Sequence, residues 1–227
     1  MNPLDFSKKR VLITQSNDFM GPVLCEVFQE LGATVLADTS ALDHPSRPAE
    51  LIQESGVVDI LLLNLGIPAP TTALSDIEDH EWNNAFAHMV DPMPRLFKAV
   101  LPQMLARGHG KIILIGSASA LRGIKRSSTY SAARGAQLAF IQAAGIELAS
   151  KQIQVNGIAQ NFVDNPTYFP SEVQENPAFQ ERLKREVPLG RLVSAREDAM
   201  FVAYLASEHA NCFVGQIFPV CGGWVNR

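Results

Sequence analysis

Short apolar runs alternate with amphipathic stretches along almost the whole chain. The apolar runs are rich in β-branched residues and predict buried strands at 9–14, 33–38, 57–64, 111–115, 154–159 and 215–220. Between them, apolar residues recur at helical spacing in 21–32, 79–105, 128–150, 171–186 and 195–207. Prolines at 92, 94 and 102 predict a kink or a break in the second of these helices. The alternation predicts an α/β fold, a Rossmann-like doubly wound parallel sheet flanked by helices, as one domain over 1–227.

Composition narrows the classes of function. The net charge is −4, and the 19 lysines and arginines are scattered, which disfavours a nucleic-acid partner. The amino terminus carries no apolar leader, and no apolar run reaches the roughly 18 residues of a membrane span, so we expect a soluble, cytoplasmic protein. The three cysteines lack metal-ligand spacing, and we expect no metal site.

The turn after the first predicted strand, 14–21, departs from a dinucleotide-binding pattern. Such turns are rich in glycine so that the backbone can approach a pyrophosphate at the start of a helix. Here only Gly21 remains, while Gln15 and Phe19 add bulk and Asp18 adds negative charge. Asp38 ends the second strand about where an acid would hold a ribose hydroxyl, although it could equally be a turn or cap residue. The turn indicates that no dinucleotide cofactor binds.

Three residues between the fourth strand and the following helix are candidates for catalysis. Ser117 lies at the carboxyl end of the strand, where open α/β sheets place their chemistry. Tyr130 follows thirteen residues later, and Arg134 lies one helical turn beyond it on the same face. A permanently charged guanidinium favours the phenolate form of a neighbouring tyrosine. Tyr130 is therefore a candidate base.

With these residues the chain resembles the short-chain dehydrogenases/reductases over nearly its whole length. The family's serine and Tyr-x-x-x-Lys correspond to Ser117 and residues 130–134, with Arg134 in place of the lysine. Three other family positions also differ: Leu63-Asn64-Leu65-Gly66 replaces Asn-Asn-Ala-Gly, Gln160-Asn161 replaces Pro-Gly, and the asparagine of the proton relay is replaced near Met89. All four departures fall on the dinucleotide groove.

A Ser-Tyr-Arg triad with an altered groove is similar to the halohydrin dehalogenases, which share this fold. The similarity extends to the aromatic Phe19, to Asn161-Phe162, to residues 165–170 (NPTYFP), to 187–192 (VPLGRL) and to 222–224 (GGW). The resemblance implies a cofactor-independent lyase that converts vicinal haloalcohols to epoxides with release of halide and a proton. It also implies the reverse opening of epoxides by azide, cyanide or nitrite, and a homotetramer.

The resemblance assigns a role to each candidate residue. Tyr130 would be the base, Ser117 would hold the substrate oxygen, and Arg134 would stabilise the phenolate. The halide site would use the backbone amides of Phe162 and Val163 together with three further residues: Phe19, Gln160 and Asn161. The substrate pocket would be completed by Phe86, Ser119, Tyr168 and Phe169.

Two alternatives remain open at this stage. A divergent NAD(P)-dependent reductase would also carry Asp38, Ser117 and Tyr130. A silent binding or scaffolding protein could have kept the fold and lost the groove, although it would have no reason to keep a charged group four residues after the tyrosine. Tight binding of NADH or NADPH would favour the reductase. If Tyr130→Phe and Arg134→Gln left every measurable activity unchanged, the binding or scaffolding protein would be favoured.

Overall fold

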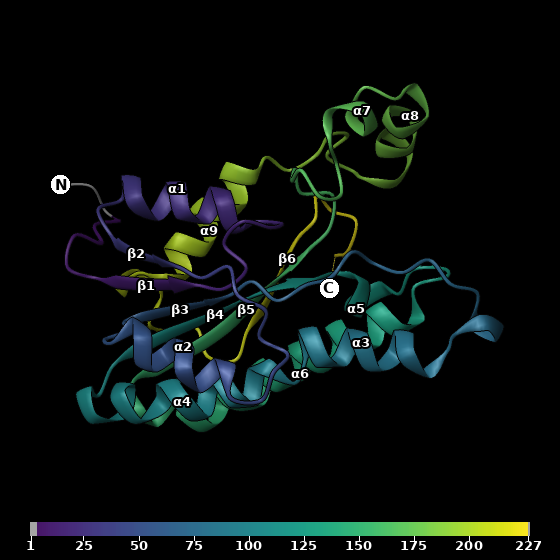
Figure 1. Ribbon diagram of the computed structural model, residues 1–227. Helices are drawn as coiled ribbons and strands as arrows, with labels where there is room; N and C mark the ends of the chain where they lie inside the picture. Colours follow the sequence, from purple (N-terminus) through teal and green to yellow (C-terminus); the bar gives the residue numbers. More distant parts are fainter. Residues whose placement is uncertain (1–3, 227) are drawn as a thin grey trace.

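Six parallel strands form one twisted sheet in the computed structural model, which describes residues 4–226 (Figure 1). The spatial order is β2-β1-β3-β4-β5-β6. The strands are β1 (Arg10–Ile13), β2 (Thr34–Ala37), β3 (Ile60–Leu63), β4 (Gly110–Ser117), β5 (Ile153–Gln160) and β6 (Ile217–Val220). The predicted α/β class and parallel sheet are confirmed. In such sheets ligands bind beyond the carboxyl ends of the strands, next to the point where the strand order reverses, which here lies between β1 and β3.

Helices cover both faces of the sheet, and each face has its own apolar core (Figure 1). One face is covered by α1 (Gly21–Glu30) and α9 (Ala195–Ala206). The other is covered by α2 (Arg47–Ser55), α4 (Pro92–Arg107) and α6 (Ser128–Leu148), with α3 (Asp79–Met89) and α5 (Ser119–Arg122) at the end nearest the carboxyl termini of the strands. The central strands are buried because helices cover both faces of the sheet: β3 is buried throughout, and β4 and β5 are buried except at their last residues.

Prolines break two of the predicted helices. The stretch 79–105 divides into α3 and α4 at Val90-Asp91, directly before Pro92, as expected. Pro92 fits the first turn of α4 because the amide that it lacks has no helical partner there. The predicted single helix 171–186 is wrong, since it divides into α7 (Ser171–Gln174) and α8 (Pro177–Glu186). There the side chain of Asn176 accepts the amide of Ala178 and starts a new helix.

The segment with α7 and α8 stands beyond the carboxyl ends of β5 and β6 (upper right in Figure 1). It is attached by an apolar cluster in which Phe162, Leu183 and Val187 are buried against Trp224. This segment closes one side of the region where the strands end. The loop between β5 and α7 therefore forms a wall of any site at that edge.

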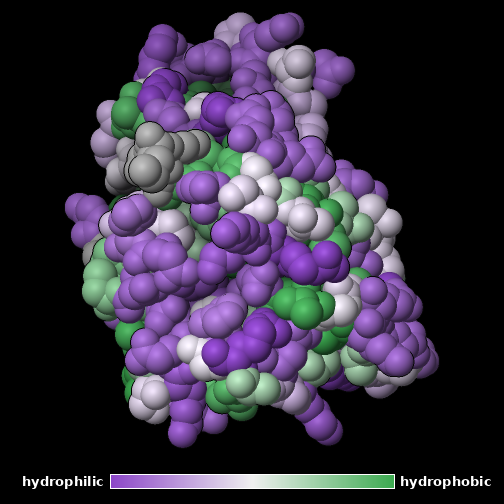
Figure 2. Space-filling view, turned by 90° about the vertical axis from the view of Figure 1, so that its left-hand side faces the viewer, coloured by the Kyte–Doolittle hydropathy of each residue, from purple (hydrophilic) through white to green (hydrophobic). Residues whose placement is uncertain are grey.

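No helix among residues 4–226 is long and apolar enough to cross a membrane. On the face shown in Figure 2 hydrophilic residues predominate, and hydrophobic residues lie in small patches between them.

Candidate active site

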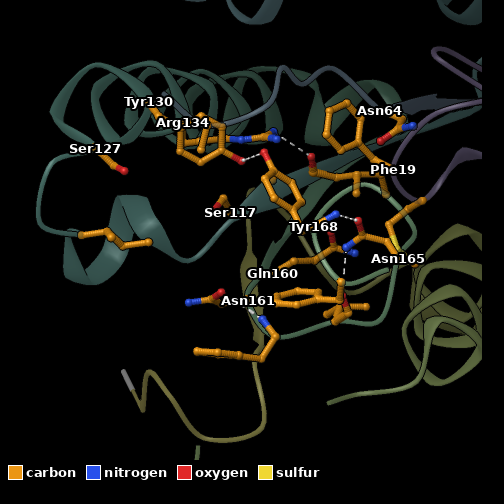
Figure 3. A pocket seen from close by; sticks show the side chains of 18 of the residues that line it. Phe19, Asn64, Ser117, Ser127, Tyr130, Arg134, Gln160, Asn161, Asn165 and Tyr168 are labelled. Atoms are coloured by element: carbon orange, nitrogen blue, oxygen red, sulfur yellow. Dashed lines mark hydrogen bonds between the residues drawn. The ribbon is translucent and has the colours of Figure 1, made fainter. Parts of the chain in front are cut away.

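A cavity of about 300 Å³ lies at the carboxyl ends of β4 and β5, between α6 and the loop after β5 (Figure 3). Ten of the twelve predicted site residues line it: Phe19, Ser117, Tyr130, Arg134, Gln160, Asn161, Phe162, Val163, Tyr168 and Phe169. Residues from four separate parts of the chain thus meet at one place. Among the lining residues the only charged side chains are Arg134 and Arg182, so the cavity carries positive charge without a carboxylate.

The other two predicted residues are not among those that line the cavity. Ser119 is almost fully buried; its amide donates to Ser117 Oγ (3.2 Å), and Ser117 Oγ donates to Ser119 Oγ (3.0 Å). Ser119 therefore orients Ser117 and does not line the cavity. Phe86 packs in the small cluster around Tyr130 and stacks on Trp82, with ring centroids 4.7 Å apart. The prediction that these two side chains face the substrate space is not what the structure shows.

Tyr130 and Arg134 are buried side by side on α6. The guanidinium carbon of Arg134 lies 5.0 Å from the centre of the Tyr130 ring. Arg134 Nη1 donates to the backbone oxygens of Leu65 (3.0 Å) and Ile115 (3.1 Å) and to Gln137 Oε1 (2.9 Å). These acceptors fix a charged group that is only 5 % exposed and hold its positive charge next to the phenol.

Gln137 supports this arrangement, and the sequence analysis missed it. Its side chain is fully buried, and Nε2 donates to the backbone oxygens of Leu65 (3.1 Å) and Met89 (2.6 Å). It thereby joins α6 to the end of α3, at the position where the family's relay asparagine was predicted to be replaced. Its place three residues after Arg134 on a helix rich in alanine is the sequence feature that could have revealed it.

A second tyrosine faces the first. Tyr168 donates its hydroxyl to the backbone oxygen of Ile67 (2.8 Å), and its oxygen lies 3.5 Å from that of Tyr130 (dashed line in Figure 3). Burial, together with the nearby Tyr130, raises the pKa of Tyr168. Tyr168 therefore remains a neutral phenol. Its ring also packs on Phe19, with centroids 5.6 Å apart, which closes the cavity toward the first turn.

Gln15 fills the turn between β1 and α1. Its Oε1 accepts the amide of Gly66 (2.7 Å), and its Nε2 donates to the Gly66 oxygen (3.0 Å). Asn64 holds the same turn from below, because its Nδ2 donates to the backbone oxygens of Gln15 and Asp18 (both 2.9 Å). These side-chain hydrogen bonds thus occupy backbone groups of Gly66 and backbone oxygens of the turn itself.

Gln15 and Phe19 adopt backbone conformations that glycine usually supplies. Their φ angles are +44° and +51°, in the left-handed region that L side chains disfavour. Phe19 also meets Arg134 at Gly66, where an added Cβ would lie 2.9 Å from Arg134 Nη2 and 3.3 Å from Phe19 Cε2. The aromatic ring and the guanidinium therefore converge on one glycine, and they leave no room there for a side chain.

One predicted anion contact is already occupied. The amide of Phe162 donates to Asn161 Oδ1 (2.9 Å), so an anion could use this amide only if the Asn161 side chain moved. The Val163 amide makes no hydrogen bond to any of residues 4–226. Phe162 itself has a φ of +52°, a third left-handed residue beside Gln15 and Phe19 in this region.

A buried acid lies behind Gln160. Gln160 Nε2 donates to Asp198 Oδ2 on α9 at 2.6 Å, and Asp198 is fully buried. Burial raises the pKa of Asp198 to about 7, and the bond from Gln160 only partly opposes this rise. The second oxygen, Oδ1, has no partner among the described residues. Sequence analysis did not find Asp198, because an acid in the first turn of a helix is usually an exposed helix-start residue.

A family model described as Enoyl-(Acyl carrier protein) reductase matches residues 10–225. The chain belongs to the short-chain dehydrogenase/reductase family. Among curated members of that family, the 3-oxoacyl-[acyl-carrier-protein] reductase FabG of Escherichia coli strain K12 is 36 % identical, with coverage of 97 % of this chain and 98 % of the relative.

Two solved structures superpose equally well on this chain and differ in chemistry. Halohydrin dehalogenase (HheC) bound to ethyl (2S)-oxiran-2-ylacetate has a TM-score of 0.89 at 28 % identity, over 96 % of this chain and 99 % of that one. A gluconate 5-dehydrogenase from Burkholderia cenocepacia J2315 in complex with NADP and tartrate also has a TM-score of 0.89, at 25 % identity, over 98 % and 97 %. The fold is shared by both types, so the choice between them depends on the residues of the site.

Short-chain reductases bind a nicotinamide dinucleotide at the turn after the first strand, and the residues here do not fit one. Gln15 and Phe19 put side chains where backbone would have to meet the pyrophosphate. Asp38, the candidate for a ribose contact, is 7 % exposed; its Oδ1 accepts from Ser40 Oγ (2.7 Å) and lies 3.6 Å from Arg47. Its Oδ2 is buried without a partner, so a ribose hydroxyl could not reach it unless neighbouring groups moved.

Proposed function

We propose that this member of the short-chain family is a halohydrin dehalogenase. It would convert vicinal haloalcohols to epoxides with release of halide and a proton, and in reverse it would open epoxides with azide, cyanide or nitrite. The observation that carries the proposal is the filled turn, in which Gln15 is bonded twice to Gly66 and Phe19 covers the cavity. A reaction without hydride transfer needs no nucleotide there.

Tyr130, Ser117 and Arg134 supply the parts that ring closure needs. Ser117 Oγ turns from Ser119 to donate to the substrate oxygen. The Tyr130 phenolate takes the hydroxyl proton, and the alkoxide attacks the neighbouring carbon from the side opposite the halogen. The carbon–halogen bond breaks with its electron pair leaving on the halide. Arg134 stabilises the phenolate charge from its fixed position over the ring.

The departing halide would lie against the wall formed by Val163, Phe19 and Gln160. The free amide of Val163 can donate to it, and the Phe19 ring can present its partly positive edge. No carboxylate lines the cavity to repel an anion, and both charged lining residues are arginines. The Phe162 amide would join this site only after Asn161 releases it.

Tyr168 and Phe169 would bound the organic part of the substrate. Tyr168 stays neutral because burial raises its pKa, so it cannot compete with Tyr130 as a base. A cavity of about 300 Å³ lined partly by Phe19, Tyr168 and Phe169 suits a small haloalcohol or epoxide. Following the dehalogenase resemblance, we also propose a homotetramer, which sedimentation would test.

The first experiment is halide release from 1,3-dichloro-2-propanol by purified protein in buffer without nucleotide. We expect steady release of chloride and an equal amount of acid. Release should continue after the protein has been treated with charcoal to remove any nucleotide. Absence of release from chlorinated and brominated substrates of two to four carbons would contradict the proposal.

A second candidate is an NAD(P)-dependent reductase, which the 36 % identity to the Escherichia coli 3-oxoacyl-[acyl-carrier-protein] reductase favours. Under this hypothesis the turn would open to admit the cofactor, and Tyr130 would donate a proton to a carbonyl oxygen. Calorimetry with NADH and NADPH decides between the two candidates. Micromolar binding together with nucleotide oxidation by a 3-oxoacyl thioester would establish the reductase, whereas we expect neither.

A further inference from the structure

The wall of the cavity contains an amide whose outer partner is a buried acid. Gln160 ends β5 and lines the cavity, while its Nε2 donates to Asp198 Oδ2 at 2.6 Å (Gln160 is labelled in Figure 3). Asp198 is fully buried, and its other oxygen has no partner among residues 4–226. An acid with a single hydrogen bond in such a place is poorly compensated as an anion.

The carboxamide of a glutamine side chain has an oxygen that accepts hydrogen bonds and an NH₂ group that donates them. While Asp198 is ionised it can only accept, so Gln160 must direct its Nε2 toward Asp198 and away from the cavity. Once Asp198 is protonated, it can donate to Gln160 Oε1. A rotation of the Gln160 carboxamide by half a turn then exchanges the positions of Oε1 and Nε2, so that the NH₂ group faces the cavity.

We propose that Asp198 is a positioning residue that couples anion binding in the cavity to proton uptake. Protonated Asp198 holds the oxygen of Gln160, and the NH₂ group of Gln160 then donates to an anion beside Val163 and Phe19. This inference rests on the proposed function only in placing a halide or small anion there. Because the dehalogenation releases both halide and a proton, high acidity would retain the halide and high pH would favour its departure.

The charged side chains around Asp198 do not account for its raised pKa, so Asp198 is the group expected to titrate at this wall. Five charged side chains lie on its own helix, on the packed helix α1 and in the loop after β5: Arg196, Glu197, Glu26, Glu30 and Asp164. Arg196 pairs with Glu30, Glu197 pairs with Arg191, and Asp164 accepts from Gln174, while Glu26 is exposed. The pKa of Asp198 is raised by burial, and none of these charges contributes to the shift. Its pKa of about 7 places the transition within a range accessible to experiment.

The test is a bromide titration followed by tryptophan fluorescence from pH 5.5 to 9. Trp224 is a suitable reporter because its ring centroid lies 6.2 Å from that of Phe162 in the cavity wall. The titration uses Tyr130→Phe as the parent protein, so that the phenol facing the cavity cannot contribute to the pH dependence. We expect the Kd for bromide to be constant at low pH and to rise up to tenfold per pH unit above about pH 7.

Two further substitutions in this parent give matched comparisons. Asp198→Asn replaces the acid with a neutral group of the same shape whose NH₂ can donate to Gln160 Oε1, as the protonated acid would. We expect tight binding that is independent of pH, at the level of the parent near pH 6. Glu26→Gln removes an exposed acid on the neighbouring α1 and should leave the pH profile of the parent unchanged.

The outcomes separate this inference from the proposed function. Bromide binding with a flat pH profile in the parent would overturn the role of Asp198 while leaving the anion site in place. Absence of bromide binding in the parent and in the wild-type protein at every pH would overturn both. Because the parent itself carries the pH test, the inference remains falsifiable even if Asp198→Asn does not fold.

Discussion

Two regions at the same edge of the sheet have diverged from short-chain reductases to different degrees. The wall formed by β4 and α6 keeps a serine and a tyrosine at family spacing, with only the lysine exchanged for Arg134. The turn between β1 and α1 keeps a single glycine, Gly21, and is filled by side chains. Gln15 and Phe19 hold positive φ angles, as glycines would, and yet carry large side chains.

The difference indicates that this chain has changed the turn, where a dinucleotide would bind, more than the wall with the serine and the tyrosine. A left-handed residue other than glycine costs roughly 1–2 kcal/mol, so two of them in one turn are a measurable burden on stability. Strain of this kind is commonly found where surrounding structure enforces it for function. Here the enforcing contacts are the two bonds from Gln15 to Gly66 and the packing of Phe19 on Tyr168. The wall formed by β4 and α6 has no residue with a positive φ angle.

The largest expected effect tests the wall formed by β4 and α6. Tyr130→Phe removes the proposed base and should reduce halide release from 1,3-dichloro-2-propanol about 10³-fold, within the usual range for general base catalysis. Tyr168→Phe is the matched control, because it removes the other phenol, which is neutral, and should cost less than tenfold. Equal losses in the two variants would show that the division of roles between the tyrosines is wrong.

The next effect concerns the contribution of Asp198, the acid bonded to the last residue of β5, to the stability of the fold. The pKa of Asp198 is raised from 3.8 to about 7 in the folded protein, which corresponds to about 4 kcal/mol of destabilisation once the acid is ionised. The contribution of Asp198 to stability is therefore fully present below pH 3.8 and is lost as the pH rises through 7.

We accordingly expect Asp198→Asn to raise the free energy of unfolding by about 4 kcal/mol at pH 8.5 and by about 2 kcal/mol at pH 5.5, where only part of the effect has developed. Urea denaturation at the two pH values measures this. A gain that is the same at both pH values would show that Asp198 does not change its ionisation on folding in this range.

A third experiment asks whether the arginine at position 134 matters for the wall formed by β4 and α6. Arg134→Gln removes the charge over the Tyr130 ring and should reduce halide release about 10²-fold, since the phenolate loses its nearest positive charge. Arg182→Gln, at the other arginine that lines the cavity, should change the rate less than threefold because Arg182 is half-exposed and pairs with Glu186. Similar losses from both would indicate a general effect of charge in the cavity.

Sequence patterns predicted the sheet and the grouping of the three candidate catalytic residues because these depend on regular spacing, whereas the other site residues were named from the family resemblance. Buried strands and a helix that starts at 128 place Ser117, Tyr130 and Arg134 together without knowledge of any contact. The contacts of the proposed halide site were predicted less well, since nothing in the sequence shows that Asn161 occupies the amide of Phe162. Asp198 and Gln137 were missed because their partners lie far away in the sequence or on the backbone, where periodicity carries no information.

The smallest effect addresses the filled turn. Phe19→Gly and Gln15→Gly remove a comparable left-handed strain, but only Phe19 lines the cavity. We therefore expect Phe19→Gly to weaken bromide binding about tenfold, as the loss of one aromatic contact would, and Gln15→Gly to change it less than twofold. Fluorescence titration at pH 6 gives both values. If the two variants weakened bromide equally, the turn would act on the anion only through its backbone, and Phe19 would be packing rather than a contact.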